Sequence, residues 1–267
     1  MIYSIQQDKN EFLTKEEILE RASSVFTSKA DSKTTSKHYV HISTEKVIDD
    51  MSALGWGVVD TKQVRARKGQ GYQKHLVVFG NDELRIDGKD GDVVFPRILM
   101  TNSHDGKYAF KFQAGLYRLV CSNGLVIADA EFASMKIRHM GYDINELSAV
   151  INEIVEKLPL TVECMNTLKG KKLSQEEKEK FALEAIGLRF DTKGKNFELQ
   201  TILEPTRNED KGDDMWSVYN VIQEKLIHGL FDYGVGAKSR KARKIQNFQQ
   251  DTKLNQELYQ LAVNYVV

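Results

Sequence analysis

The sequence contains few of the residues that usually identify a redox site, a metal site or a membrane segment. Only two cysteines, Cys121 and Cys164, occur in 267 residues, and two cysteines alone build neither a disulfide framework nor a zinc site. No apolar run approaches the roughly 20 residues that span a bilayer. The first twelve residues lack the basic and then apolar pattern of a secretory signal. We therefore expect a protein of the reducing bacterial cytoplasm with no membrane partner.

The sequence also lacks an excess of charge and lacks familiar catalytic motifs. Its 38 basic and 38 acidic residues cancel, which argues against a protein that coats nucleic acid with its whole surface but allows one basic groove. The glycine-containing segment from Gly69 to Lys74 lacks the spacing of a phosphate loop, and neither a dinucleotide fingerprint nor a Gly-x-Ser-x-Gly elbow occurs. We expect no enzymatic activity and no cofactor.

The organising stretch of the chain runs from Ile98 to Leu125. It reads as a strand, a polar turn at Asn102–Gly106, a second strand over Tyr108–Val120 and another turn at Cys121–Gly124. Asparagine and glycine favour such turns because they tolerate positive φ.

Periodicity predicts the remaining elements. Helices are expected over Thr14–Phe26, after Ser43 or Thr44 up to Gly55, from Asp143 to beyond Leu158, from Ser174 to Gly187, from Trp216 to Leu230 and over Lys238–Tyr265. Extended segments are expected over Tyr39–Ile42, Gly57–Lys68, Tyr72–Phe79 and Arg189–Gln200, and Ser28–Lys37 is expected to be a linker. The expected fold class is α+β, an antiparallel β-meander backed by a helix and followed by a mostly helical C-terminal region. The expected divisions are 1–37 (helix and flexible linker), 38–141 (α+β core) and 142–267 (helical region).

Three segments also carry a family resemblance. NSHDG at Asn102–Gly106, GLYRLVCSNGL at Gly115–Leu125 and KIRHMG at Lys136–Gly141 resemble an uncharacterised phage/plasmid-like protein family, a domain of unknown function found in bacteriophage genomes, plasmids and prophages. WSVYNVIQEKLIHG at Trp216–Gly229 resembles its C-terminal helix. The resemblance implies a mobile-element origin and no established reaction. Its family-motif turn residues are Asn102, His104, Asp105, Gly106, Cys121, Asn123, Gly124 and His139.

The first candidate site is a basic hairpin. Its two predicted strands and their turn carry Lys62, Arg65, Arg67, Lys68 and Lys74, and such a hairpin can follow a phosphate backbone and release counterions. The alternative is a solvated hairpin that keeps an edge strand from aggregating. Other cations could extend a groove: Arg97, Arg118, Lys136 and Arg138.

Two further candidates remain open. GAKSRKARK at Gly236–Lys244 is either the start of a DNA-contacting or partner-binding helix or a solvated helix end, although a helix dipole disfavours cations at that end. The polar groups of the two central turns, His104, Asp105, Cys121 and His139 among them, could bind a metal, act as a base or form a nucleophile pair. The alternative is that they serve turn geometry and the core.

The layout suggests a function. A helix that ends in Gly55-Trp56 and leads into an extended basic strand resembles the layout of single-strand annealing recombinases, in which a twisted meander forms rings with a basic groove for single-stranded DNA. We therefore predict a phage- or plasmid-type protein that binds single-stranded nucleic acid, assembles as a homo-oligomer, with a ring as one form, and promotes strand annealing in recombination. The alternatives are a mobile-element accessory factor that binds and inhibits a host defence protein, and a metal-assisted hydrolase that uses His104, Asp105 and His139.

Overall fold

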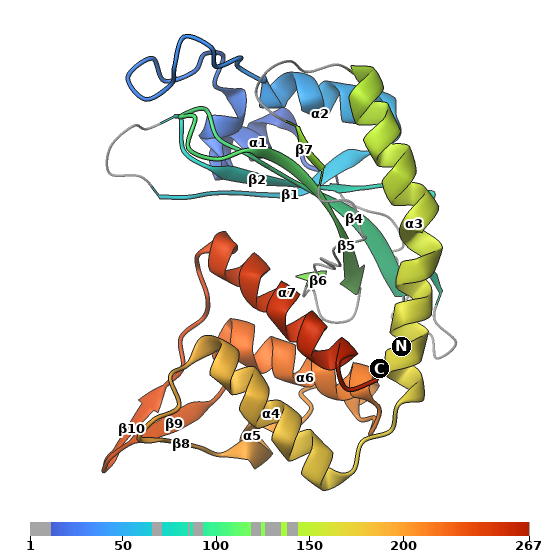
Figure 1. Cartoon of the computed structure of the whole chain (residues 1–267), viewed down its shortest axis with the longest axis vertical. Coiled ribbons are helices and arrows are strands. Elements are labelled where there is room, and N and C mark those ends of the chain that lie inside the picture. Colours follow the sequence, from blue (N-terminus) through green and yellow to red (C-terminus); the bar gives the residue numbers. More distant parts are fainter. Residues whose placement is uncertain are drawn as a thin grey trace, which may run out of the picture. The chain divides into compact units, whose positions relative to one another are not determined.

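A computed structural model describes residues 12–65, 71–84, 86–87, 93–118, 124–125, 135–137 and 144–266. The fold is α+β, as the sequence predicts (Figure 1). The chain divides into two compact units. The first comprises Met1–Asp87, Val94–Tyr117 and Ala130–Lys157, and the second comprises the remaining residues.

The first unit is built on an antiparallel arrangement of strands. Its strands are Gly57–Gln63 (β1), His75–Gly80 (β2), Ile86–Asp87 (β3), Val93–Asn102 (β4), Phe110–Arg118 (β5) and Met135–Ile137 (β7). The strand order is β1-β2-β4-β5, with β3 on β4 and β7 on β5. The pairs β1–β2, β2–β4 and β5–β7 are antiparallel. A further short strand, Gly124–Leu125 (β6), follows β5 in the chain.

Short helices pack against β1 in this unit, where Figure 1 shows them. They are Lys15–Arg21 (α1), the 3-10 helix Ser23–Phe26 (η1) and Thr44–Ala53 (α2). The predicted capping box is confirmed, because Thr14 Oγ1 accepts from Glu17 N and Glu17 accepts from Thr14 N. Ser43 caps α2. Apolar side chains from helices and strands form the core, among them Val47, Met51, Val77, Phe79 and Phe110.

Two predictions for this unit are wrong. The first helix breaks at Ala22, whose φ of −149° is not helical, so η1 is a separate turn. Residues Tyr39–Ile42 form no strand. A side-chain contact connects that segment to the central turn instead, since the Tyr39 hydroxyl donates to the Ser103 carbonyl at 3.1 Å. Trp56, which follows α2, is 2% exposed and belongs to the core of this unit.

The second unit is mostly helical. Its helices are Gln175–Arg189 (α4), Leu199–Leu203 (α5), the 3-10 helix Asn208–Asp210 (η2), Met215–His228 (α6) and Phe248–Val263 (α7), and Ile144–Gly170 (α3) contributes residues to both units. The predicted capping box of Ser174 and Glu177 is confirmed. Every residue from Met215 to Ile227 of α6 is buried. The buried Glu224 of this helix is paired with Arg207 and accepts from the Thr206 hydroxyl at 2.5 Å.

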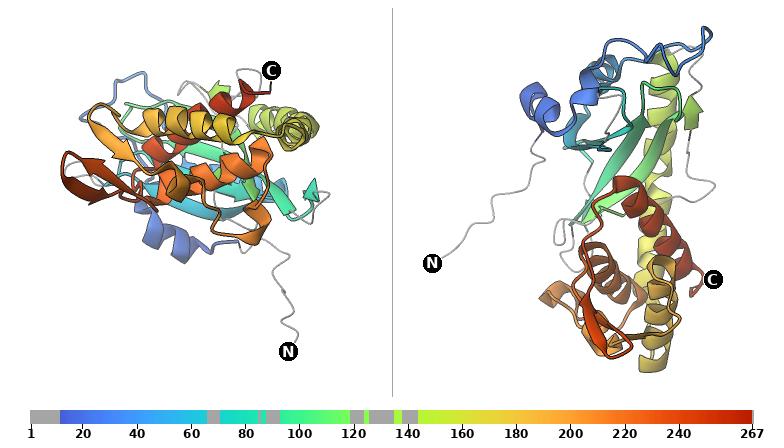
Figure 2. Two further views of the ribbon diagram at one scale, coloured as in Figure 1. Left: turned by 90° about the horizontal axis from the view of Figure 1, so that it is seen from below. Right: turned by 90° about the vertical axis from the view of Figure 1, so that its left-hand side faces the viewer.

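A small antiparallel sheet completes the second unit and corrects two predictions. Its strands are Lys195–Phe197 (β8), Asp232–Val235 (β9) and Lys238–Lys241 (β10), in the order β10-β9-β8. Both views show it beside the helices of its unit (Figures 1 and 2). Lys238–Tyr265 is therefore not one helix: Gly236, at φ +59°, makes a hairpin turn, and Asn247 caps α7 only after the basic segment. Likewise, Arg189–Gln200 is not continuously extended, because α4 passes through Gly187 to Arg189 and only β8 is a strand.

Candidate nucleic-acid interface

Strand register places several of the predicted cations on one face of the first-unit sheet. Lys62 of β1 pairs with Leu76, and Leu76 pairs with Thr101 of β4, so these side chains share a face. Gly80 lies four positions after Leu76 in β2 and pairs with Arg97 of β4, so the Arg97 side chain also belongs to this face. Lys74 extends the ladder by one residue, since its carbonyl accepts from Val64 N at 2.9 Å, and alternation gives it the same side as Leu76. We call this side the cationic face.

The densest group on the cationic face is formed by Lys74, Tyr108 and Lys111, which we call the lysine–tyrosine cluster. The Lys74 ammonium lies 4.6 Å from the centroid of the Tyr108 ring, and Tyr108 is 42% exposed. Partial burial and the nearby charge of Lys111 lower the pKa of Lys74. Two neighbouring ammonium groups therefore repel each other beside an exposed aromatic ring, which is an arrangement that an anion would stabilise.

The other predicted cations differ in accessibility. Lys62 is exposed and lies 3.4 Å from Asp60, which also lies 3.7 Å from Arg21. Arg65 follows β1 and is exposed. Arg97 is only 6% exposed, with its guanidinium 5.4 Å from the Phe95 ring, so it is not an accessible part of the cationic face. The accessible part of the cationic face is thus Lys62 and the lysine–tyrosine cluster, whereas alternation places Arg65, like Gln63, on the opposite side of the ladder.

Six of the predicted site residues lie outside the described residues: Arg67, Lys68, Arg138, Cys121, Asn123 and His139. Arg118 ends β5, Gly124 begins β6, and Lys136 lies in β7 opposite Lys111 in the strand register. The sequence analysis missed Tyr108 and Lys111. The signal was alternation in β5, where Phe110 and Phe112 are fully buried and Lys111 points to the other side.

The opposite face carries a buried polar network centred on His75. Its Nε2 lies 2.8 Å from the Thr44 hydroxyl, and its Nδ1 lies 3.1 Å from the Ser24 hydroxyl and 3.2 Å from the Gln73 carbonyl oxygen. Asn102 Nδ2 donates to Thr44 Oγ1 at 3.0 Å. Because Thr44 Oγ1 accepts this bond, its own proton can point to Nε2, which leaves the His75 proton on Nδ1 for the carbonyl.

Burial of this network favours neutral histidine. His75 is fully buried, and desolvation lowers its pKa to about 4. The network joins η1, the first turn of α2, β2 and the end of β4. It therefore fixes the predicted Asn102–Gly106 turn against the helices, which is a structural task.

The rest of that turn is also tied into the first unit. His104 is buried, its backbone N donates to the Tyr72 carbonyl, and its ring lies 4.7 Å from His41 and 5.2 Å from His75 between centroids. Asp105 accepts from Lys107 N at 3.1 Å, and Gly106 adopts φ +71°. Among the described residues, no group of three His, Cys, Asp or Glu side chains could hold a metal ion.

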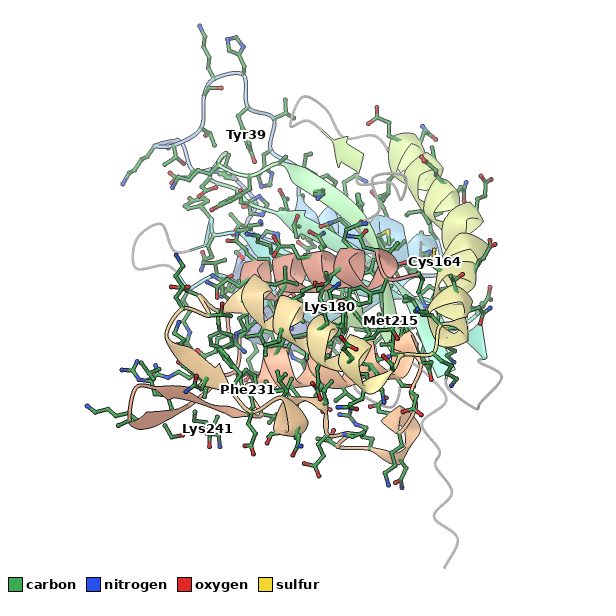
Figure 3. All side chains as sticks on the ribbon, turned by 60° about the horizontal axis from the view of Figure 1, so that its bottom comes forward. Tyr39, Cys164, Lys180, Met215, Phe231 and Lys241 are labelled. Carbon is green, nitrogen blue, oxygen red and sulfur yellow. The ribbon has the colours of Figure 1, made fainter. Side chains whose placement is uncertain are left out.

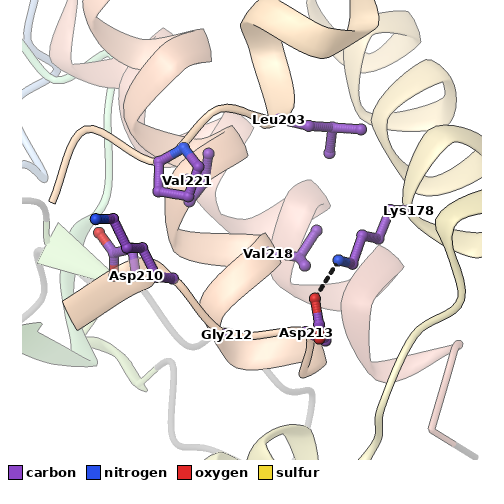
Figure 4. Close-up of a pocket in the computed structure, with 9 residues that line it drawn as sticks. Lys178, Leu203, Asp210, Gly212, Asp213, Val218 and Val221 are labelled. Atoms are coloured by element: carbon purple, nitrogen blue, oxygen red, sulfur yellow. Dashed lines mark hydrogen bonds and ion pairs between the residues drawn. The ribbon is translucent and has the colours of Figure 1, made fainter. Parts of the chain in front are cut away.

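The second unit contains a small pocket. Its lining includes an ion pair between Lys178 and Asp213 at 2.5 Å, together with Asp210, Gly212 and Val218 (Figure 4). Its volume of about 230 Å³ is below the roughly 300–1,000 Å³ of most ligand pockets. Its lining combines charged residues with apolar ones and contains no serine, threonine, cysteine or histidine, so the cationic face remains the better candidate site.

Comparison with known proteins identifies relatives without a stated activity. Residues 32–259 match the family described as "Domain of unknown function (DUF932)". The UPF0380 proteins YafZ and YfjQ of Escherichia coli (strain K12) are each 28% identical to this chain over 254 residues, which cover 94% of this chain and 90% of each relative. No solved structure matches the chain. Within the described residues, no helix is long and apolar enough to cross a membrane.

Proposed function

The chain belongs to the DUF932 family of domains of unknown function, and because that family supplies no activity we propose from the chain's own residues that it binds single-stranded nucleic acid. The observation that carries this proposal is the lysine–tyrosine cluster. Single strands are bound by cations that follow the backbone and by aromatic rings on which bases stack. Lys74, Lys111 and Tyr108 supply both kinds of contact at one place on the cationic face.

Electrostatics support a phosphate ligand for this cluster. Partial burial lowers the pKa of Lys74, and the charge of Lys111 lowers it further because each charge destabilises the other. A phosphate placed between the two ammonium groups would replace this repulsion by two charge-assisted contacts. Exposed Lys62 lies on the same face in the neighbouring strand β1, so a phosphate backbone could continue from the cluster towards this strand.

The proposed contact favours single strands over duplexes. A paired and stacked base cannot offer its face to Tyr108, whereas an unpaired base can, and stacking contributes about 1–3 kcal/mol per base. Strand annealing in a phage- or plasmid-type pathway, by a homo-oligomer, is the role we propose for this binding. Annealing requires that strands be held and counterions released, and it requires no nucleophile.

A double variant of the cluster tests the proposal. The variant K74A/K111A removes two phosphate contacts, and K15A/K46A serves as the matched control. The control removes the same charge from the exposed faces of α1 and α2, where Lys15 and Lys46 pair with carboxylates. Binding of a fluorescein-labelled 20-nucleotide single strand is measured by anisotropy at several salt concentrations.

The expected result separates the two variants. K74A/K111A lowers the slope of log K against log salt by about 1.4, at about 0.7 per phosphate contact on single strands, and weakens binding to all sequences alike. K15A/K46A leaves the slope unchanged. Equal slopes for both variants would contradict the assignment of the cluster, and absence of binding by the unmodified protein at low salt would contradict the function.

A further inference from the structure

The strand β10 and the residues that follow it carry a run of exposed charges of one sign. Five cations lie between Lys238 and Lys244, and all are exposed: Lys238, Arg240, Lys241, Arg243 and Lys244. No carboxylate occurs between Gly236 and Asn247. Asp232 is opposite Lys241 in the strand register, yet none of the five cations forms an ion pair within the part of the chain that the structure describes. We call these five residues the basic edge.

The backbone of the basic edge is fixed by the helices of its own unit. Ala242 N donates to the Phe231 carbonyl at 3.0 Å, and Ile245 N donates to the Ile227 carbonyl at 2.8 Å. The Arg189 guanidinium donates to the carbonyls of Leu226 and Arg243. Figure 3 labels Lys241 on the outer strand of the small sheet and Phe231 nearer the helices. Cations on such a held strand lose less conformational freedom on binding than cations on a free tail would.

The same sheet presents an aromatic pair beside the cations. Tyr233 of β9 lies opposite Arg240 on one side and opposite Phe197 of β8 on the other. The Tyr233 and Phe197 rings are stacked, with centroids 5.6 Å apart and planes at 19°. Both rings also contact the ring of Phe190, at 5.3 Å and 5.7 Å between centroids. Both side chains are partly exposed. Lys195 and Lys238 flank this pair because both are opposite Val235.

We propose that the basic edge and the Tyr233–Phe197 pair form a second binding surface for single-stranded nucleic acid, separate from the lysine–tyrosine cluster. This inference rests on the proposed function. Cations at alternate strand positions, such as Lys238 and Arg240, are roughly 6.6–6.8 Å apart and can each contact a different phosphate. The parts of these two rings that Phe190 leaves exposed offer a base an aromatic contact, which an acidic polypeptide would not use.

Two surfaces on one chain have a mechanistic consequence. A protein with two strand-binding surfaces can hold two segments of nucleic acid at once, and the second binding event then occurs at a raised effective concentration. Holding two strands together is the physical requirement of annealing. The basic edge therefore supplies what the lysine–tyrosine cluster alone lacks.

The test uses the full chain and a charge-matched pair of triple variants. K238A/R240A/K241A removes three cations of the basic edge. K172A/K211A/K253A removes three exposed lysines elsewhere in the second unit, two of which lie near carboxylates. Both variants change the net charge by the same amount, so a difference between them reports position. K238Q/R240Q/K241Q keeps the side-chain bulk and guards against a folding defect, which circular dichroism would show.

Anisotropy titrations of a labelled 20-nucleotide single strand at several salt concentrations give the answer. We expect the basic-edge variants to lower the salt slope by about 2, at about 0.7 per lost contact, and the control to keep the slope of the unmodified protein. We also expect the number of strands bound per chain at saturation to fall from two to one. If the unmodified protein binds but the basic-edge variants keep its slope and stoichiometry, this inference is overturned and the proposed function stands.

Two other outcomes of these measurements would overturn the inference for different reasons. If the unmodified protein binds no single strand, the proposed function fails, and this inference fails with it. If the basic-edge variants keep full DNA binding but lose binding to labelled poly-L-glutamate, the surface recognises an acidic polypeptide, and the assignment to nucleic acid is overturned.

Discussion

The two faces of the first-unit sheet carry polar residues that differ in burial and in hydrogen bonding. His75 and Lys74 are neighbours in the chain, yet alternation directs them to opposite faces. On one face, His75 and Asn102 are buried and their hydrogen bonds are made within the protein. On the other, Lys74 lies beside Lys111 and the exposed ring of Tyr108. A polar group that is buried and hydrogen-bonded inside the fold serves stability, whereas like charges that lie together beside an exposed ring suit the binding of an anion.

The largest expected effect comes from breaking the buried face. His75→Ala removes the hydrogen bonds to Thr44 and Gln73 and leaves a cavity, so we expect the free energy of unfolding to fall by about 3–5 kcal/mol. Urea denaturation measures this loss. Lys74→Ala is the matched substitution on the other face, and we expect it to change stability by less than about 0.5 kcal/mol. Similar losses for the two variants would contradict the contrast between the faces.

The next largest effect is expected from low pH, which should reduce the stability of the fold through His75. The pKa of His75 is lowered from 6.5 in the unfolded chain to about 4 in the fold. The unfolded state therefore binds the proton more readily, and stability that is present above pH 6.5 is lost as the pH falls towards 4. The full shift corresponds to about 3 kcal/mol at about 1.36 kcal/mol per pH unit.

A variant without the titrating group isolates this effect. His75→Gln keeps a polar side chain but cannot ionise, so its stability should fall less between pH 6.5 and 4.5 than that of the unmodified protein. Urea denaturation at several pH values gives both curves. Parallel curves would show that another group controls acid unfolding.

The cationic face should respond in binding rather than in stability. Tyr108→Ala removes the proposed stacking surface, and we expect single-strand binding to weaken by about 1–3 kcal/mol while the salt slope stays unchanged. Tyr108→Phe retains the ring and should bind like the unmodified protein. Anisotropy titration compares the three proteins. A defect in the phenylalanine variant as large as that in the alanine variant would assign the effect to the hydroxyl group instead.

The smallest effect is expected at Lys62. Its ammonium lies 3.4 Å from Asp60, and this exposed ion pair should contribute no more than about 1 kcal/mol to stability. Because Asp60 already compensates its charge, Lys62→Ala should lower the salt slope by less than Lys74→Ala does. Equal reductions for the two variants would contradict the compensation of Lys62 by Asp60.

Many helix starts and turns could be predicted from the sequence because interactions between neighbouring residues determine them. The capping residues Thr14, Ser43 and Ser174 and the turn at Asn102–Gly106 act through neighbouring residues, so their positions follow from short patterns. The strand conformation of Lys238–Lys241 could not be predicted in this way. It depends on pairing with β9 and on the left-handed backbone of Gly236, which makes the hairpin turn. Lysine and arginine carry no periodic apolar signal that would separate a strand from a helix.

The candidate site was predictable in part for the same reason. Lys62 and Lys74 could be assigned to one hairpin from the sequence. The burial of Arg97 and the meeting of Lys74 with Tyr108 depend on which strands become neighbours, and this is a property of the folded sheet. The inward orientation of His104 likewise depends on the helices and loops that cover it.

The most direct test of the central claim is an anisotropy titration of the unmodified protein with labelled single-stranded and double-stranded 20-nucleotide DNA at three salt concentrations. The oligomeric state of the sample is measured first by light scattering. We expect tighter binding to the single strand, with log K falling linearly as log salt rises. Absence of binding at the lowest salt concentration, or binding that salt does not weaken, would contradict it.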